Sequence, residues 1–332
     1  MKKPANSFKK KSSKCAIIGS GAWGLAIAGL LAQNGQQVLT FSQYKTEAEK
    51  INKKYGRSAF PMFASNDFKL VVKDSDFIFL VVPSDAVLLV LKSLSKEKIS
   101  SQTKIIICSK GIEGKGLQLF SDCVDQTLPN NSYAILSGPN FASEVAKLLP
   151  TTTTIASTSR ESALEIANLL KNDNFLPVIS NDIVATQIFG SIKNILAIGC
   201  GIVDGLKLGQ NAKAALIFNG VLEANLLVKK LGGKPSESFF SPCGLGDLFL
   251  TCSSKKSRNN SLGFLIGSGK NIQEILDSGK TFEGFKASQS MIKFAKKHQI
   301  TLHLCQKINQ ILQGKFTTTE IKNIISNAIL SN

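Results

Sequence analysis

The chain has 332 residues, a length typical of about two domains, and its 43% hydrophobic and 19% charged residues are those of an ordinary soluble globular protein. Its formal net charge is +17, to which six lysines in residues 1–14, a segment without acids, contribute +6. The remaining +11 consists of scattered lysines without interleaved aromatic residues. We therefore expect a disordered basic tail over residues 1–14 and no nucleic-acid partner, although a positive surface favours anionic small molecules.

Neither an export signal nor a membrane anchor is predicted. No apolar segment follows the basic tail, and no stretch approaches the roughly 20 apolar residues that cross a bilayer. Seven cysteines without a C-x-x-C pair indicate reduced thiols and a cytoplasmic location. The two histidines, His298 and His303, have no cysteine or acid at ligand spacing, so we expect neither a metal site nor a histidine-based triad.

The predicted elements, in chain order, indicate an α/β fold followed by helices. Apolar strands are predicted over residues 15–19, 37–41, 76–83, 103–111, 132–139, 151–158 and 175–180. Helical patterns separate them, over residues 22–34, 45–55, 84–94, 116–128 and 160–172. This alternation favours a parallel sheet covered on both faces.

Strand signals end near Asp182. The later patterns are helical and cover residues 182–206, 211–233, 271–279, 285–299 and 318–330. We therefore expect a dinucleotide-binding Rossmann domain over residues 15–185 and an all-helical, substrate-binding domain over residues 186–332.

The first strand leads into a G-x-G-x-x-G motif formed by Gly19, Gly21 and Gly24. Because the motif lies between a strand and a helix, we interpret it as a dinucleotide site rather than a tight turn alone. Gly19 would permit the turn, Gly21 would admit the pyrophosphate, and Gly24 would let the helix pack closely on the strand. Free N–H groups at the helix start would face the phosphates.

The residues after the second strand bear on the choice of nucleotide. An NAD-selective site usually has Asp or Glu there, which binds the ribose 2′-hydroxyl. Ser42, Gln43 and Tyr44 occupy these positions. Lys45 follows, and either pairs with a 2′-phosphate or is a solvated helix residue. The sequence therefore predicts NAD or NADP, with a modest preference for NADP.

Polar residues at strand ends and in one apolar helix are candidates for chemistry. Lys110 follows one strand, and Gly138 and Asn140 follow the next, at the sheet edge where ligands bind. Lys193 lies in an otherwise apolar helix. It either extends to solvent or is buried with a pKa drawn towards neutrality, which suits proton transfer.

A second group of polar residues lies further along the chain. Asp247 is placed in a glycine-rich turn, and the polar run Ser257, Arg258 and Asn259 follows it. Arg258 is one of few arginines in a lysine-rich chain, and a guanidinium is suited to bidentate contact with phosphate.

Together these segments give the chain a resemblance to a known family, from about Cys15 to Leu330. The matching stretches are GSGAWG, VVPS, SKGIE, SGPNFASE, GSIKNILAIGCGIVDGL, NAKAALI, GLGDLFLTC, SRN and FEG. In this order they are highly specific, and the chain resembles bacterial-type NAD(P)-dependent glycerol-3-phosphate dehydrogenases.

The resemblance implies reversible reduction of dihydroxyacetone phosphate to sn-glycerol 3-phosphate with NAD(P)H, which would supply phospholipid synthesis. We also expect a homodimer without stable membrane insertion.

The resemblance further implies roles for individual residues. Lys193 would donate a proton to the carbonyl oxygen and accept it in reverse. Substrate would be held by Lys110, Gly138, Asn140, Lys193, Asp247, Ser257, Arg258 and Asn259. The cofactor would be held by Gly19, Gly21, Ala22, Trp23, Gly24, Gln43, Lys110, Ala142, Arg258, Thr281 and Glu283.

Some positions depart from the family pattern. Asn140 stands where Thr or Ser is usual, and Gln43 replaces a basic residue or histidine, which weakens the NADP prediction. Residues 52–63 copy the family's loop poorly.

Two alternative functions fit part of the pattern. A reductase of sugar acids or keto acids would share the two-part architecture, but GLGDLFLTC followed by SRN speaks against it. A dinucleotide-sensing protein whose tail binds nucleic acid would have no need for Lys193, Asp247 and Arg258.

Overall fold

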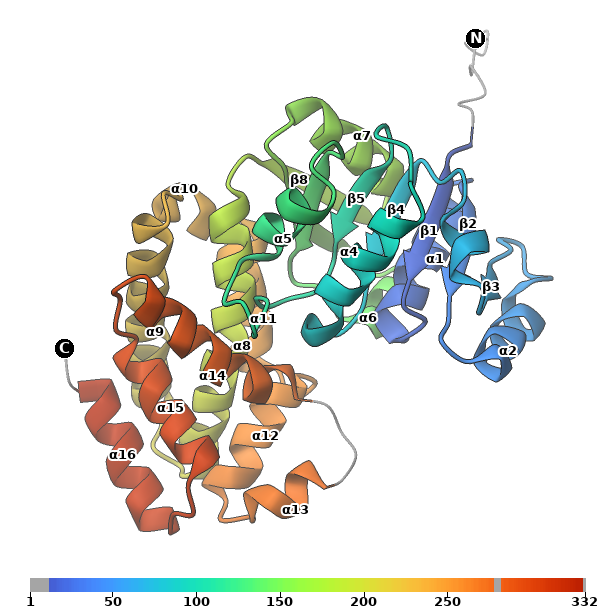
Figure 1. Ribbon diagram of the computed structural model, residues 1–332. Coiled ribbons are helices and arrows are strands. Elements are labelled where there is room, and N and C mark those ends of the chain that lie inside the picture. Colours follow the sequence, from blue (N-terminus) through green and yellow to red (C-terminus); the bar gives the residue numbers. More distant parts are fainter. Residues whose placement is uncertain (1–11, 278–281, 331–332) are drawn as a thin grey trace, which may run out of the picture.

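The structure, a computed structural model, describes residues 12–277 and 282–330. Figure 1 shows a part built around a sheet, coloured blue to green, beside a part made of helices, coloured yellow to red.

An eight-stranded sheet forms the first part. Its strands are β1 (Lys14–Ile18), β2 (Gln37–Phe41), β3 (Phe63–Ser65), β4 (Phe77–Leu80), β5 (Lys104–Ile107), β6 (Tyr133–Ser137), β7 (Thr151–Ala156) and β8 (Phe175–Ser180). They lie in the order β3-β2-β1-β4-β5-β6-β7-β8. From β1, the strands β2 and β3 are added on one side of the sheet, and β4 and the later strands on the other. Open α/β sheets bind ligands at such a switch in strand order.

All neighbouring strands are parallel except β6 and β7, which are antiparallel. The predicted α/β fold is confirmed, but the sheet is not parallel throughout. A parallel crossover needs a dozen or more residues, usually with a full helix. Residues 138–150 contain only the four-residue helix α6 (Ala142–Val145), so β7 returns beside β6 in the opposite direction.

Helices cover both faces of the sheet. They are α1 (Ala22–Gln33), α2 (Lys45–Tyr55), α3 (Phe68–Val72), α4 (Val87–Lys96), α5 (Phe120–Thr127) and α7 (Arg160–Leu170), with a 3-10 turn at Ser84–Ala86. Successive strand residues point to opposite faces, so Ile17 packs in the core with α1 and α7 while Ile18 packs with α4 and α5. The short elements β3 and α3 have no counterpart in the sequence prediction. β1 begins at Lys14, the last residue of the predicted tail.

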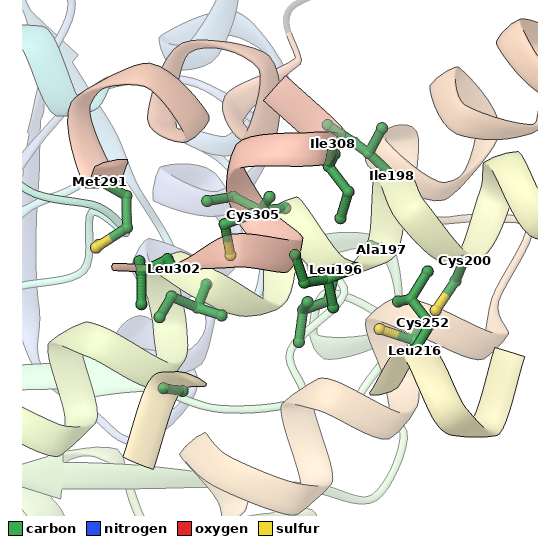
Figure 2. Close-up of a cluster of buried hydrophobic side chains, with 14 of the residues drawn as sticks. Leu196, Ala197, Ile198, Cys200, Leu216, Cys252, Met291, Leu302, Cys305 and Ile308 are labelled. Carbon is green, nitrogen blue, oxygen red and sulfur yellow. The ribbon is translucent and has the colours of Figure 1, made fainter. Parts of the chain in front are cut away.

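The second part is helical throughout its described residues. Its helices are α8 (Ile183–Gly205), α9 (Gln210–Lys230), α10 (Pro235–Phe239), α11 (Asp247–Ser253), α12 (Arg258–Gly267), α13 (Ile272–Leu276), α14 (Glu283–Lys297), α15 (His303–Gln313) and α16 (Thr318–Leu330). A π-helical turn, Pro242–Gly246, precedes α11. Figure 2 shows the core, in which Leu196 and Ile198 of α8 lie among Leu216 and Ile308 of neighbouring helices.

By length and composition alone, α8 is apolar enough to cross a membrane, with a mean hydropathy of 1.5. This corrects the expectation that no stretch of the sequence approaches that length. In the fold, however, 94% of the most apolar 18-residue stretch of α8 is buried inside the protein. A helix that is apolar on all sides is expected at the centre of a helical core, and α8 occupies that place.

Glycines bring α8 and α12 into backbone contact. A Cβ atom added to Gly201 of α8 would collide with the carbonyl oxygen of Asn260, and one added to Gly263 of α12 would collide with that of Ile198. The two helices are therefore held at a separation that no larger residue permits.

Candidate active site

The glycine motif forms the turn between β1 and α1. Gly19 has a φ of +120°, and a Cβ atom there would collide with the carbonyl oxygen of Val81. A Cβ atom on Gly24 would collide with the carbonyl oxygen of Gly19, so α1 packs tightly on the turn. A Cβ atom on Gly21 would meet no atom within 4 Å. Gly21 therefore faces open space, as a phosphate-binding glycine must.

A cavity of about 750 Å³ opens where the sheet edge meets the helical part. The predicted residues on its wall are Gly21, Ala22, Trp23, Gly24, Lys110, Asn140, Ala142, Lys193, Ser257, Arg258, Asn259 and Glu283. Gly19, Gln43, Gly138 and Asp247 are not on this wall, and Thr281 lies outside the described residues. Residues from both predicted domains thus meet around one cavity.

Two lysines share one buried carboxylate at the inner wall of this cavity. Lys193 Nζ lies 2.6 Å from Asp247 Oδ1, and Lys110 Nζ lies 2.5 Å from Asp247 Oδ2. Lys110 Nζ also donates to the carbonyl oxygen of Gly138 at 3.3 Å. Asp247 is 1% exposed, so it lies behind the two ammonium groups, and the lysines are presented to the cavity.

The charges of this cluster explain how its lysines titrate. With all three groups ionised, two positive charges face one negative charge. Burial and the neighbouring charge of Lys110 lower the pKa of Lys193 to about 8, against the attraction of Asp247. Burial also acts to lower the pKa of Lys110, but its contacts with Asp247 outweigh burial and raise that pKa. Lys193 is therefore the group that gives up a proton most readily.

Thr251 completes the cluster, and sequence reasoning missed it. Its Oγ1 accepts a hydrogen bond from Lys193 Nζ at 2.7 Å and donates to the backbone oxygen of Asp247 at 2.6 Å. Thr251 lies four residues after Asp247 in α11, so the two share a helix face. That spacing is the signal by which the sequence could have revealed it.

Local structure holds Asp247 in place. The residue is the first of α11 and directly follows the π-helical turn, rather than lying within a glycine turn as predicted. The N–H of Cys243 in that turn donates to Thr154 Oγ1 of β7 at 3.0 Å. The antiparallel strand β7 thereby fixes the turn, and with it the carboxylate.

The side chain of Asn140 is hydrogen-bonded to strand β7. Its Nδ2 donates to the carbonyl oxygen of Thr152 at 2.9 Å, and its Oδ1 accepts from Thr153 Oγ1 at 2.9 Å. Ser137, in the same wall, has a buried hydroxyl without a hydrogen-bond partner among the described residues. The amide of Asn140 thus supports the wall of the cavity.

The starts of α12 and α14 form the outer wall. Ser257 Oγ caps α12 by accepting from the N–H of Asn260 at 3.3 Å. Asn259 Oδ1 accepts from the N–H of Gly284 at 3.0 Å, which ties α12 to α14. Arg258 has a side chain that is 60% exposed and lies 3.9 Å from Glu283. Its guanidinium is therefore available to an anion in the cavity.

The end of β2 differs from the expectation drawn from the sequence. Gln43 is exposed, and no acid directly follows the strand. The carboxylate of Glu47, however, reaches back from the first turn of α2 to the hydroxyl of Ser42, at 2.5 Å. A carboxylate therefore lies beside the end of β2, although no acid directly follows the strand in sequence.

Neither histidine lies on the wall of the cavity. In the described ranges 12–277 and 282–330, no group of three His, Cys, Asp or Glu residues is placed to hold a metal ion. The ring of His298 lies against Phe294, with 4.7 Å between ring centroids, and His303 is exposed at the start of α15.

Two family models match separate parts of the chain. Residues 14–163 match the family model described as NAD-dependent glycerol-3-phosphate dehydrogenase N-terminus, and residues 182–323 match that of the C-terminus. The chain belongs to the NAD-dependent glycerol-3-phosphate dehydrogenase family. The family resemblance drawn from the sequence motifs is confirmed.

Relatives of this glycerol-3-phosphate dehydrogenase family match over nearly the whole chain. A glycerol-3-phosphate dehydrogenase (NAD(P)+) of Fusobacterium nucleatum is 36% identical over 321 residues, covering 93% of this chain and 95% of the relative. One from Erythrobacter litoralis is 36% identical, covering 91% and 93%. The crystal structure of the Coxiella burnetii enzyme superposes with a TM-score of 0.88 at 33% identity, covering 96% of this chain and 99% of that one.

Proposed function

We propose that this member of the family reversibly reduces dihydroxyacetone phosphate to sn-glycerol 3-phosphate with a reduced nicotinamide dinucleotide. The observation that carries the proposal is the pair of lysines, Lys193 and Lys110, on the wall of a cavity that is also lined by Gly21, Gly24 and Arg258. In the cell, the product supplies glycerol phosphate for phospholipid synthesis in the cytoplasm.

The residues around α1 fit a dinucleotide. Gly21 is the N-cap of this twelve-residue helix and has no side chain that accepts hydrogen bonds from the N–H groups of the first turn. These N–H groups are therefore available to an anion. Ala22 and Trp23 line the cavity beside them. The pyrophosphate would bind to this turn, and the nicotinamide, when bound, supplies the hydride.

Lys193 is the proton donor in this proposal. Addition of hydride to a ketone leaves negative charge on the oxygen, which must be neutralised as it forms. The Lys193 ammonium donates a proton to that oxygen, and loss of this proton converts a cluster of net charge +1 into the neutral pair of Lys110 and Asp247. In the reverse direction, neutral Lys193 accepts the proton of the hydroxyl.

The phosphate of the substrate is held at the outer wall. Arg258 is the first residue of α12, a ten-residue helix, and lies with Ser257 and Asn259 on the wall of the cavity. Its guanidinium offers two parallel donors to a phosphate. Lys110 binds a hydroxyl or carbonyl oxygen of the substrate at the inner wall.

A direct assay tests the function. Purified protein should oxidise NADH or NADPH, followed by absorbance, in the presence of dihydroxyacetone phosphate. A non-phosphorylated ketone such as dihydroxyacetone is the control, and turnover should fall steeply without the phosphate. Equal turnover of the two ketones would refute the proposed phosphate site.

Gly21→Val tests the cofactor site. The new side chain would project into the space assigned to the pyrophosphate, while no protein atom within 4 Å of the added Cβ obstructs it. We expect a folded protein whose affinity for dinucleotide, measured by fluorescence titration, is reduced at least about tenfold. The control is Gly29→Ala, at a glycine of α1 outside the cavity, where an added Cβ atom makes only an ordinary contact with Met62 Sδ at 3.7 Å. Unchanged affinity in Gly21→Val would place the cofactor elsewhere.

A homodimer is the assembly we propose, with α9 in the interface. Phe218, Leu222 and Leu226 repeat every four residues along α9 and are exposed, and Phe218 is 60% exposed. A continuous apolar stripe of this kind is typical of a protein interface. Light scattering should give twice the chain mass of 35.7 kDa, and Phe218→Glu with Leu222→Glu should give the single-chain mass. Leu89→Glu, at an exposed leucine of α4, is the control; a double variant that stays dimeric would exclude this interface.

The preference between NADH and NADPH is a finer question. The lack of an acid directly after β2 is the basis on which the sequence predicts a preference for NADPH. The position of Glu47 bears on it, as argued next.

A further inference from the structure

The carboxylate of Glu47 joins the glycine turn to the end of β2. Its Oε2 accepts a hydrogen bond from Ser20 Oγ at 2.9 Å and from Ser42 Oγ at 2.5 Å. Ser20 lies between the first two glycines of the motif, and Ser42 is the first residue after β2. A side chain from α2 thus reaches the place where the two segments meet.

This place is where a Rossmann fold holds the adenosine ribose. The pyrophosphate lies at the turn before α1, and the ribose follows it towards the carboxyl end of β2. In NAD-selective proteins an acid that directly follows β2 binds the ribose 2′-hydroxyl. Here the acid comes from the third residue of α2, five positions after Ser42, so its sequence position conceals it.

The charge of Glu47 is not neutralised within the protein. Both of its hydrogen-bond partners are uncharged hydroxyls that use Oε2, and no cation lies within 4.0 Å of it among the described residues. Oε1 has no hydrogen-bond partner in the same described part of the chain. A free carboxylate oxygen accepts readily from a hydroxyl and repels a phosphate.

We propose that Glu47 is the residue that selects NADH over NADPH. Its free oxygen accepts a hydrogen bond from a ribose hydroxyl of NADH, and its charge repels the 2′-phosphate of NADPH. Lys45, exposed at the start of α2, acts in the opposite sense but makes no ion pair with Glu47. The inference rests on the cofactor site proposed above and reverses the preference drawn from the sequence.

Binding of NADH and NADPH to the same variants tests the inference, because these two cofactors differ only in the 2′-phosphate. We expect the wild-type protein to bind NADH more tightly, by about tenfold or more, in a fluorescence titration without substrate. Glu47→Gln should raise NADPH affinity by about tenfold and change NADH affinity by less than about threefold. The ratio of kcat/KM for the two cofactors should shift by the same factor.

Glu49→Gln is the matched control, because it removes a negative charge from the same helix at an exposed side chain that contacts neither serine. It should leave the NADPH-to-NADH ratio unchanged. If Glu47 only braces the turn, Glu47→Gln weakens both cofactors equally and the inference is overturned. A wild-type preference for NADPH also overturns it. Gly21→Val, titrated alongside, shows separately whether the cofactor site itself is misplaced.

Discussion

Replacing Lys193 by alanine should lower kcat by about 10² to 10⁴ in either direction of the reaction. The ammonium is the group on the cavity wall whose pKa, about 8, suits donation of a proton near neutrality. Without it, the oxygen that gains charge has no proton donor at that place. Dinucleotide affinity should hardly change, because Lys193 belongs to α8 and the glycine turn belongs to the sheet. Stopped-flow absorbance and fluorescence titration give the two readouts.

Lys193→Arg should lower kcat almost as much as Lys193→Ala. A guanidinium remains charged at any pH that the protein tolerates, so it cannot release and regain a proton in each cycle. Lys213→Ala is the control, since Lys213 also forms a shielded ion pair, at 2.7 Å from Asp204, but lies outside the cavity. Near-normal kcat in a folded Lys193→Ala protein would transfer the role of proton donor to another group.

Asp247→Asn should move the pH dependence of the reaction. In the wild-type protein, reduction requires protonated Lys193, so its rate should be level below pH 8 and fall above it, while oxidation should rise towards pH 8. The carboxylate opposes the fall in the pKa of Lys193, and an amide does not. Removing the charge should lower that pKa by about one to three units. Half of Lys193 is protonated at pH 8 in the wild-type protein, so reduction at pH 8 should then be about 5- to 500-fold slower.

The control for Asp247→Asn is Asp204→Asn, which removes a carboxylate from another lysine pair of the helical part. Its pH profile should match that of the wild-type protein. If the rate of reduction by Asp247→Asn still begins to fall near pH 8, the carboxylate of Asp247 does not influence the titration of Lys193. Thermal unfolding of both variants separates loss of stability from loss of chemistry.

Much of the fold was readable from local patterns, because strand and helix signals depend on neighbours in sequence. The apolar strands up to Ser180 and the glycine motif are of this kind. The direction of a strand depends on its pairing with strands distant in sequence, which no local pattern contains, and the antiparallel β7 was missed for that reason. Three-residue β3 is too short to show a period.

The candidate site was only partly readable. Lys193 stood out as a charge in an apolar helix, and Asp247 as an acid in a glycine-rich stretch. Their pairing joins residues 54 positions apart, and the pairing of Lys110 with Asp247 joins residues 137 positions apart, so no local pattern contains it. Glu47 was missed because a side chain from α2 performs what a residue directly after β2 was expected to perform.

The glycine contact between α8 and α12 should limit the length of the substrate that the cavity accepts. Lys193 lies on α8 and Arg258 begins α12, and the helices touch through backbone atoms at Gly201 and Gly263. Side chains at an interface can repack to accept a longer molecule, but two backbones in contact have nothing to rearrange. Under the roles proposed for Lys193 and Arg258, we therefore expect a ketone with an additional carbon between its carbonyl and its phosphate to be reduced more slowly than dihydroxyacetone phosphate.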